Sequence, residues 1–88
     1  MDNYSIYKTI AKLSQPNNGY TKELNVISWN NREPVYDIRT WDAEHTKYGK
    51  GVTLSVNQLI ELKQLLDKMS LADISSMMYG YGIDEPHN

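Results

Sequence analysis

The sequence predicts an α+β fold, a four-stranded antiparallel meander followed by one amphipathic helix. From Tyr4 to Leu54, runs of alternating side chains are separated by turn-forming residues, which is typical of short antiparallel strands. From Ser55 onward, the apolar residues instead recur with a period of about 3.6, which is typical of a helix with one apolar face. With 88 residues, the chain is expected to form one domain.

Turn-forming residues mark the boundaries of the strands. The segment Gln15–Gly19 combines proline, asparagine and glycine, which favour turns. Asn30 and Asn31 predict a tight turn, because asparagine tolerates a positive φ better than other non-glycine residues. Pro34 can precede a strand but could not lie inside a central one. The strands are therefore expected at Tyr4–Leu13, Tyr20–Trp29, Val35–Trp41 and Gly51–Leu54.

A capping signal starts the helix. Ser55 and Gln58 have the spacing of a capping box, in which each side chain bonds to the backbone N–H of the other residue. We assign residues 1–69 to one domain and residues 70–88 to a short helix capped by Ser70 or a loosely ordered tail. The helix carries a wide apolar stripe formed by Val56, Leu59, Ile60, Leu62, Leu65, Leu66 and Met69.

The size of the chain and the width of this stripe predict a homodimer. A domain of this size buries only about 60–65% of its unfolded surface, and the chain has no cysteine for disulfides. The helix can cover one sheet face, over Tyr36 and Ile38, and the stripe is broader than that face requires. We expect Leu59, Leu62 and Leu66 to contact a second subunit.

Composition argues against a membrane protein and is weakly informative about partners. No run approaches the roughly 18 apolar residues of a membrane span, and the first residues lack the apolar centre of a signal peptide. A soluble, cytoplasmic protein is therefore expected. Residues 1–52 carry seven basic and six acidic side chains, whereas residues 53–88 carry two basic and five acidic ones. This asymmetry is compatible with a polyanion partner for the first half.

The third predicted strand raises the main functional question. Alternation places Arg39 and Trp41 on the same side as Val35 and Asp37. If the helix covers the other side, Arg39 and Trp41 face outward, where the indole can stack on a base and the guanidinium can meet a phosphate. The alternative is a structural role, with a cross-strand aromatic contact and an ion pair from Arg39 to Asp37 or Glu33.

Other candidate residues give weaker signals. Trp29 is expected to be a packing residue near the end of a hairpin. Lys22, Arg32, Lys47 and Lys50 lie in or beside predicted turns, where a phosphate backbone could reach them. No phosphate-binding loop, nucleophile arrangement or cofactor motif is present, so no enzyme and no cofactor are expected. No metal is expected either, because Asp42, Glu44 and His45 are neighbours in one loop without a converging scaffold.

The segment from about Tyr20 to Leu66 resembles the Positive Cofactor Four family of transcriptional coactivators, particularly its small bacterial members. The resemblance lies in the DIR-x-W element, the GKG-x-x-L strand and the amphipathic helix that follows. It implies a homodimer of β-β-β-β-α subunits with grooves for single-stranded DNA and little sequence preference. It also implies that Arg39 and Trp41 line the groove and that Lys47 and Lys50 bind phosphates. The hairpin tip, Asn30–Glu33, departs from the eukaryotic pattern, being less basic and lacking its aromatic residue.

The leading hypothesis is a non-enzymatic single-stranded DNA-binding homodimer acting in transcription, replication or repair, with RNA as a further candidate ligand. Its expected contacts are Lys22, Arg32, Arg39, Trp41, Lys47 and Lys50. The alternative is a protein-interaction adaptor that contacts polymerase or another transcription factor without binding nucleic acid.

Overall fold

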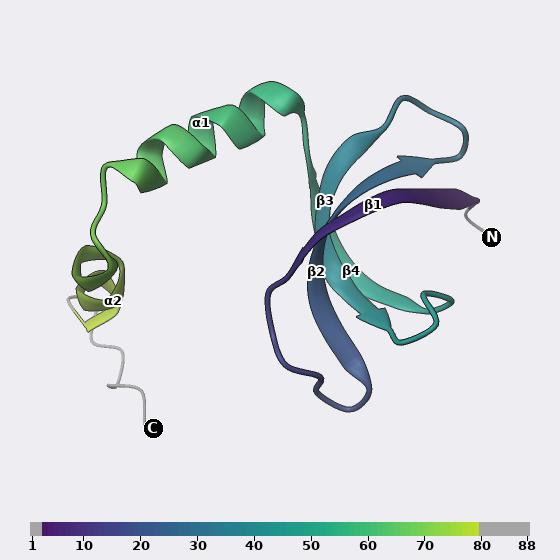
Figure 1. Cartoon of the computed structure of the whole chain (residues 1–88), viewed down its shortest axis with the longest axis horizontal. Coiled ribbons are helices and arrows are strands. Elements are labelled where there is room, and N and C mark those ends of the chain that lie inside the picture. Colours follow the sequence, from purple (N-terminus) through teal and green to yellow (C-terminus); the bar gives the residue numbers. More distant parts are fainter. Residues whose placement is uncertain (1–2, 80–88) are drawn as a thin grey trace.

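The computed structural model describes residues 3–79, which form a four-stranded antiparallel sheet followed by two helices (Figure 1). This confirms the predicted α+β class and the order of the elements. The fourth strand begins at Tyr48, earlier than the predicted Gly51, and the second helix is present. The elements are β1 (Tyr4–Lys12), β2 (Tyr20–Trp29), β3 (Val35–Asp42), β4 (Tyr48–Leu54), α1 (Val56–Asp67) and α2 (Leu71–Tyr79).

The four strands form a meander that is strongly bent. Their order in the sheet is β1-β2-β3-β4, so each strand pairs with its neighbour in sequence. The pairing of β1 with β2 shifts register twice, and that of β3 with β4 shifts once, and such irregularities bend and twist a strand. As a result Trp29 and Trp41, which lie near opposite ends of the sheet, stack with ring centroids 6.3 Å apart.

The Gly-Lys-Gly segment of β4 permits one of these irregularities. A Cβ atom added at Gly49 would collide with the hydroxyl of Thr40, and one added at Gly51 would collide with the backbone and Cβ of neighbouring β3 residues. Both glycines therefore allow β4 to approach β3 closely. The two glycines therefore serve the packing of β4 against β3.

The sheet has two chemically different faces. We call the face that carries Glu23, Asn25 and Ile27 the inner face, because these side chains are buried on the concave side of the bend. The register places Arg39 and Asp37 opposite them on β3. The other side, the outer face, carries partly exposed apolar residues, among them Leu24, Val26, Tyr36, Ile38 and Val52.

The first helix begins as predicted but does not cover the sheet. Ser55 and Gln58 form both hydrogen bonds of a capping box. However, α1 buries none of its residues and runs away from the sheet (Figure 1), and among the elements of residues 3–79 it touches only β3 and β4. The expectation that it covers Tyr36 and Ile38 is therefore wrong for the single chain. The radius of gyration is 15.4 Å, whereas a compact chain of this length would have about 12 Å.

The second helix is capped by Ser70, which was one of the two alternatives for this segment. The Ser70 hydroxyl accepts from the backbone N–H of Asp73 at 3.0 Å, and the Asp73 carboxylate accepts from the backbone N–H of Ser70 at 2.9 Å. The hydrogen bond from the Ser70 backbone lowers the pKa of Asp73. The tail predicted after α2 lies outside the described residues. In the described part, neither helix is long and apolar enough to cross a membrane.

Candidate functional site

Four aromatic side chains occupy the inner face, and Trp41 lies among them. We call this group the aromatic cluster: Tyr4, Trp29, Trp41 and Tyr48. The ring of Trp41 lies 5.2 Å from that of Tyr4 and 5.1 Å from that of Tyr48, and Trp41 is 0% exposed. The expectation that Trp41 faces outward is wrong. Arg39 and Trp41 do share one face, but it is the face that the bend of the sheet buries.

Arg39 is fixed by an ion pair within its own strand. Its Nε donates to Oδ1 of Asp37 at 2.7 Å, and its Nη2 donates to Oδ2 at 2.9 Å. The guanidinium also lies 4.7 Å from the centroid of the Trp29 ring and 5.6 Å from that of Tyr48. Since Asp37 is fully buried and the Arg39 side chain is only 14% exposed, the charge of Arg39 is largely compensated. This geometry favours the structural role considered for Arg39, an ion pair with Asp37, over a contact with phosphate.

Buried polar groups complete the inner face. Glu23 is 2% exposed, and its carboxylate contacts Nε2 of His45 at 2.9 Å and accepts from Nδ2 of Asn25 at 3.2 Å. His45 thus bonds across the sheet, while the carboxylate of Asp42 is directed to its own loop. In residues 3–79 there is no group of three or more side chains positioned to hold a metal ion.

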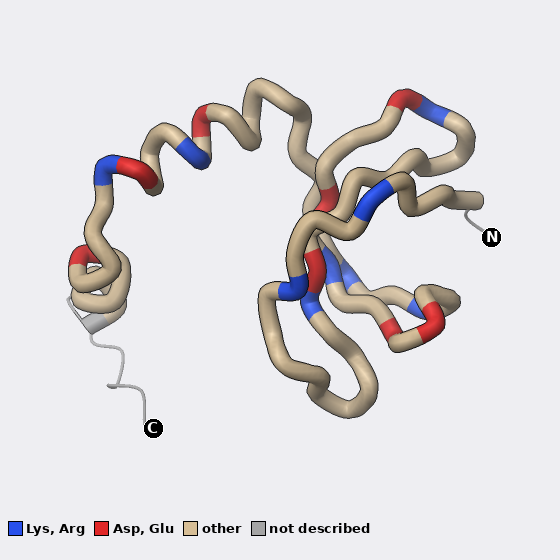
Figure 2. The backbone as a smooth tube through the Cα atoms, in the orientation of Figure 1, with Lys and Arg blue, Asp and Glu red and all other residues tan. Residues whose placement is uncertain are grey.

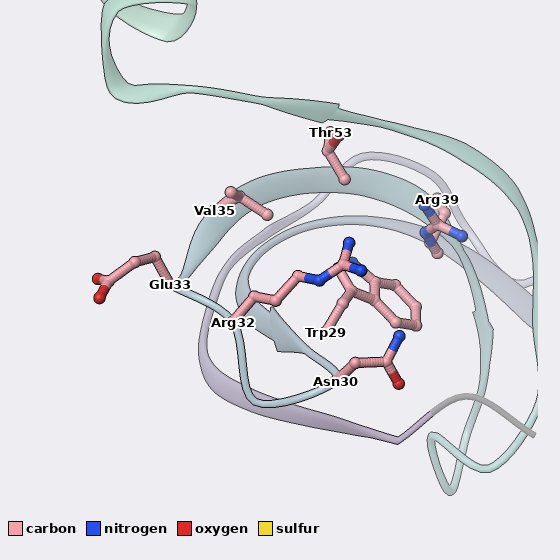
Figure 3. A pocket seen from close by; sticks show the side chains of 7 residues that line it. All are labelled: Trp29, Asn30, Arg32, Glu33, Val35, Arg39 and Thr53. Atoms are coloured by element: carbon pink, nitrogen blue, oxygen red, sulfur yellow. The ribbon is translucent and has the colours of Figure 1, made fainter.

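A pocket opens beside the aromatic cluster at the β2–β3 hairpin. We call it the hairpin pocket; its volume is about 380 Å³, at the lower end of the roughly 300–1,000 Å³ typical of small-ligand sites. Figure 3 shows its lining, which combines one aromatic ring, two arginines and several small or polar side chains. The lining residues are Trp29, Asn30, Arg32, Glu33, Val35, Arg39 and Thr53.

The two arginines of this pocket differ in their freedom to bind a ligand. Arg39 is held by Asp37, whereas the guanidinium of Arg32 has no ion pair or hydrogen bond within the described residues. Glu33, next to Arg32, points away from the pocket (Figure 3). Arg32 is thus the cation of the pocket that is available to an anionic ligand.

The pocket contains functional candidates that sequence reasoning missed. Trp29 packs in the aromatic cluster, as predicted, but it also forms part of the pocket lining, which was not expected. The sequence did not mark Asn30 and Thr53 as functional residues. Asn30 indicated only a turn, and Thr53 indicated only a strand. The one available clue was the position of Trp29 directly before the Asn-Asn turn, which places an aromatic ring at the end of a hairpin.

The three predicted lysines do not join this pocket. Lys22 pairs with Thr40 and lies on the outer face, and Lys50 is exposed in the irregular stretch of β4. Lys47 is exposed in the β3–β4 loop. Figure 2 shows basic and acidic positions interleaved along the sheet and the helices. Of the predicted cations, only Arg32 and Arg39 are brought together.

A second hollow lies in the β1–β2 connection. Its volume is about 510 Å³, and it is lined by Lys12, Leu13, Ser14, Gln15, Pro16 and Thr21. Its lining contains one cation and no aromatic ring. The hairpin pocket therefore has the better combination for a ligand that is both flat and anionic.

Asp42 organises the loop that carries Lys47. Its carboxylate accepts from the backbone N–H of Lys47 at 2.9 Å and from that of Thr46 at 2.8 Å. The bond from Lys47 has the largest effect and lowers the pKa of Asp42; partial desolvation opposes it, and the bonds from Thr46 lower the pKa further.

When the pH falls below the ordinary pKa of an aspartate, the β3–β4 loop is therefore expected to lose its hydrogen bonds to Asp42. Because the folded-state pKa is lowered, the loop contacts are fully present above the unfolded-state pKa and are lost as pH falls through the folded value. The amide proton shifts of Thr46 and Lys47 should report this transition in a pH titration. An Asp42→Asn variant should show no such transition, and a midpoint at or above the ordinary value would contradict the assignment.

Comparison with known proteins adds a family match. Residues 17–65 match the family model described as Transcriptional Coactivator p15 (PC4), so the match covers all of β2, β3 and β4 and most of α1. An uncharacterized protein of Treponema pallidum (strain Nichols) is 44% identical over 68 residues, which are 77% of this chain and 80% of that protein. The hairpin pocket lies entirely within the matched segment.

Proposed function

The chain belongs to the transcriptional coactivator p15 (PC4) family, and we propose that it is a non-enzymatic single-stranded DNA-binding protein acting in transcription, replication or repair. Membership of the family indicates a role in nucleic-acid binding or as a transcription cofactor. The preference for a single strand over a duplex is part of our proposal. It rests on the hairpin pocket, where a half-buried indole lies beside a free guanidinium.

The chemistry of the pocket supports an unpaired base as its ligand. A duplex hides the faces of its bases, whereas a single strand can present a base for stacking while its phosphate meets a cation. Trp29 supplies an aromatic ring, over which the Arg39 guanidinium also lies, and Arg32 supplies the cation. We assign Arg39 to positioning, since its contacts with Asp37 and Trp29 fix the wall of the pocket.

We further propose that the working form is a homodimer in the cytoplasm. The single chain leaves the apolar stripe of α1 uncovered, with Leu62 and Leu66 exposed and Leu59 partly so. The outer face of the sheet also exposes Val52. A second copy would cover both surfaces and would place two hairpin pockets in one particle.

Titration of the full chain against labelled single-stranded DNA, duplex DNA and RNA tests the proposal. Single-stranded DNA should bind most tightly, and log K should fall with log salt at a slope of about −0.7 for each neutralised phosphate. Arg32→Gln should reduce the magnitude of that slope by about 0.7, because it removes one phosphate contact.

Lys63→Gln is the matched control for this slope. Lys63 lies on α1, is paired with Asp67 at 2.8 Å and is far in sequence from the pocket, so its loss should leave the slope unchanged. Equal binding of single-stranded and duplex DNA would contradict the single-strand preference. Binding to none of the three nucleic acids would instead favour an adaptor that contacts the transcription machinery.

A further inference from the structure

The polar groups of the hairpin pocket are mainly hydrogen-bond donors. Asn30 sets this polarity, because the backbone N–H of Asn3 donates to its side chain at 3.0 Å. An N–H donor requires an acceptor, so the amide atom that faces Asn3 is Oδ1. The backbone N–H of Asn30 donates in return to the carbonyl of Asn3 at 2.6 Å, which anchors the hairpin end to the start of β1.

The nitrogen of the Asn30 side-chain amide, Nδ2, is consequently directed away from Asn3. Figure 3 shows its nitrogen turned toward Trp29, with the oxygen turned away. Nδ2 carries two N–H donors and no acceptor. The guanidinium of Arg32 adds further donors, and the carboxylate of Glu33 points out of the pocket (Figure 3). The hydroxyl of Thr53 can donate or accept.

From this polarity we infer that the hairpin pocket selects a keto base, which is thymine, uracil or guanine, from the bound single strand. The inference rests on the proposed function. A base stacked on Trp29 presents its edge to the Asn30 amide nitrogen, which donates to the carbonyl oxygen at position 4 of a pyrimidine or position 6 of guanine. Cytosine and adenine carry an amino group there, so two donors would face each other and this hydrogen bond would be lost. Asn30 is exposed, so water satisfies its amide, and the discrimination is that of about one hydrogen bond.

Oligomers of deoxyuridine and deoxycytidine of equal length form the sharpest test. Uracil and cytosine have nearly the same size. They differ at position 4, which carries an oxygen or an amino group, and at N3, which is a donor in uracil and an acceptor in cytosine. The full chain should bind the deoxyuridine oligomer about three- to tenfold more tightly at one salt concentration, the effect of about one hydrogen bond. The pH is kept well above the range in which cytosine binds a proton. Equal affinities would overturn the inference.

Asn30→Asp reverses the polarity without changing the shape of the side chain. Aspartate retains the acceptor for the N–H of Asn3, tolerates the φ of 53° at this position, and replaces the Nδ2 donor by an acceptor. The ratio of the two affinities should therefore fall to one or below. An unchanged ratio would overturn the inference, because the preference would then arise elsewhere.

Asn31→Asp is the control, since it adds the same charge one residue away. Asn31 also has a positive φ, 60°, but does not line the pocket. Its variant should bind both oligomers more weakly and keep the wild-type ratio, and a fall equal to that of Asn30→Asp would overturn the inference. If no oligomer binds, the proposed function fails as well, whereas binding with equal affinities removes only the base preference.

Discussion

Replacing Trp41 by alanine is expected to remove most of the domain's stability. Trp41 is fully buried in the aromatic cluster, and loss of a core tryptophan costs about 3–5 kcal/mol. Whole domains are stable by only about 5–15 kcal/mol, and small ones lie toward the lower end. The melting temperature should therefore fall by more than about 12 °C, which calorimetry or circular dichroism can measure.

Tyr7→Ala is the control for this experiment. Tyr7 is an aromatic residue of β1 that is 62% exposed, so its loss should change the melting temperature little. A second measurement does not depend on a variant that unfolds. In a Trp29→Phe protein the remaining indole is Trp41, whose emission should be blue-shifted and resistant to iodide. A freely quenched Trp41, or a Trp41→Ala protein as stable as the wild type, would contradict the burial of this side chain.

The strands and the helices were predictable because their signals are local. Alternation in β3 correctly placed Asp37, Arg39 and Trp41 on one face, and the Asn30-Asn31 turn has the positive φ values that asparagine tolerates. The start of β4 was missed because Gly49 resembles a loop residue. It is in fact required where β4 approaches Thr40.

The identity of the buried face could not be derived from alternation. Alternation states which residues share a face, but the direction in which a sheet bends depends on irregularities in strand pairing. The inner face here carries Glu23, Asn25 and Asp37, which by composition resemble a solvent-exposed face. The hydrogen bond between Glu23 and Asn25, that of Asp37 with Arg39 and that of Glu23 with His45 support their burial. Such partners become apparent only when the strands are paired.

Replacing Leu66 by aspartate is expected to dissociate the proposed homodimer. Leu66 is 44% exposed in the single chain, and α1 buries no residue there, so the single chain should tolerate the change. In a dimer each copy would lose the burial of one leucine, about 1.5–3 kcal/mol. Dissociation should therefore become easier by at least about a hundredfold. Sedimentation should show the mass of two chains for the wild type and of one chain for the variant at micromolar concentration.

Gln64→Asp provides the matched control, because it adds the same charge on the other side of α1. Positions 64 and 66 are two residues apart, which places them on opposite sides of a helix with about 3.6 residues per turn. Gln64→Asp should therefore keep the dimer. The melting temperature of the wild type should also rise with protein concentration, since association stabilises only the folded chain, whereas that of Leu66→Asp should not. A wild-type chain that sediments as a monomer throughout the micromolar range would refute the dimer. The exposed stripe of α1 would then be expected to contact a different protein.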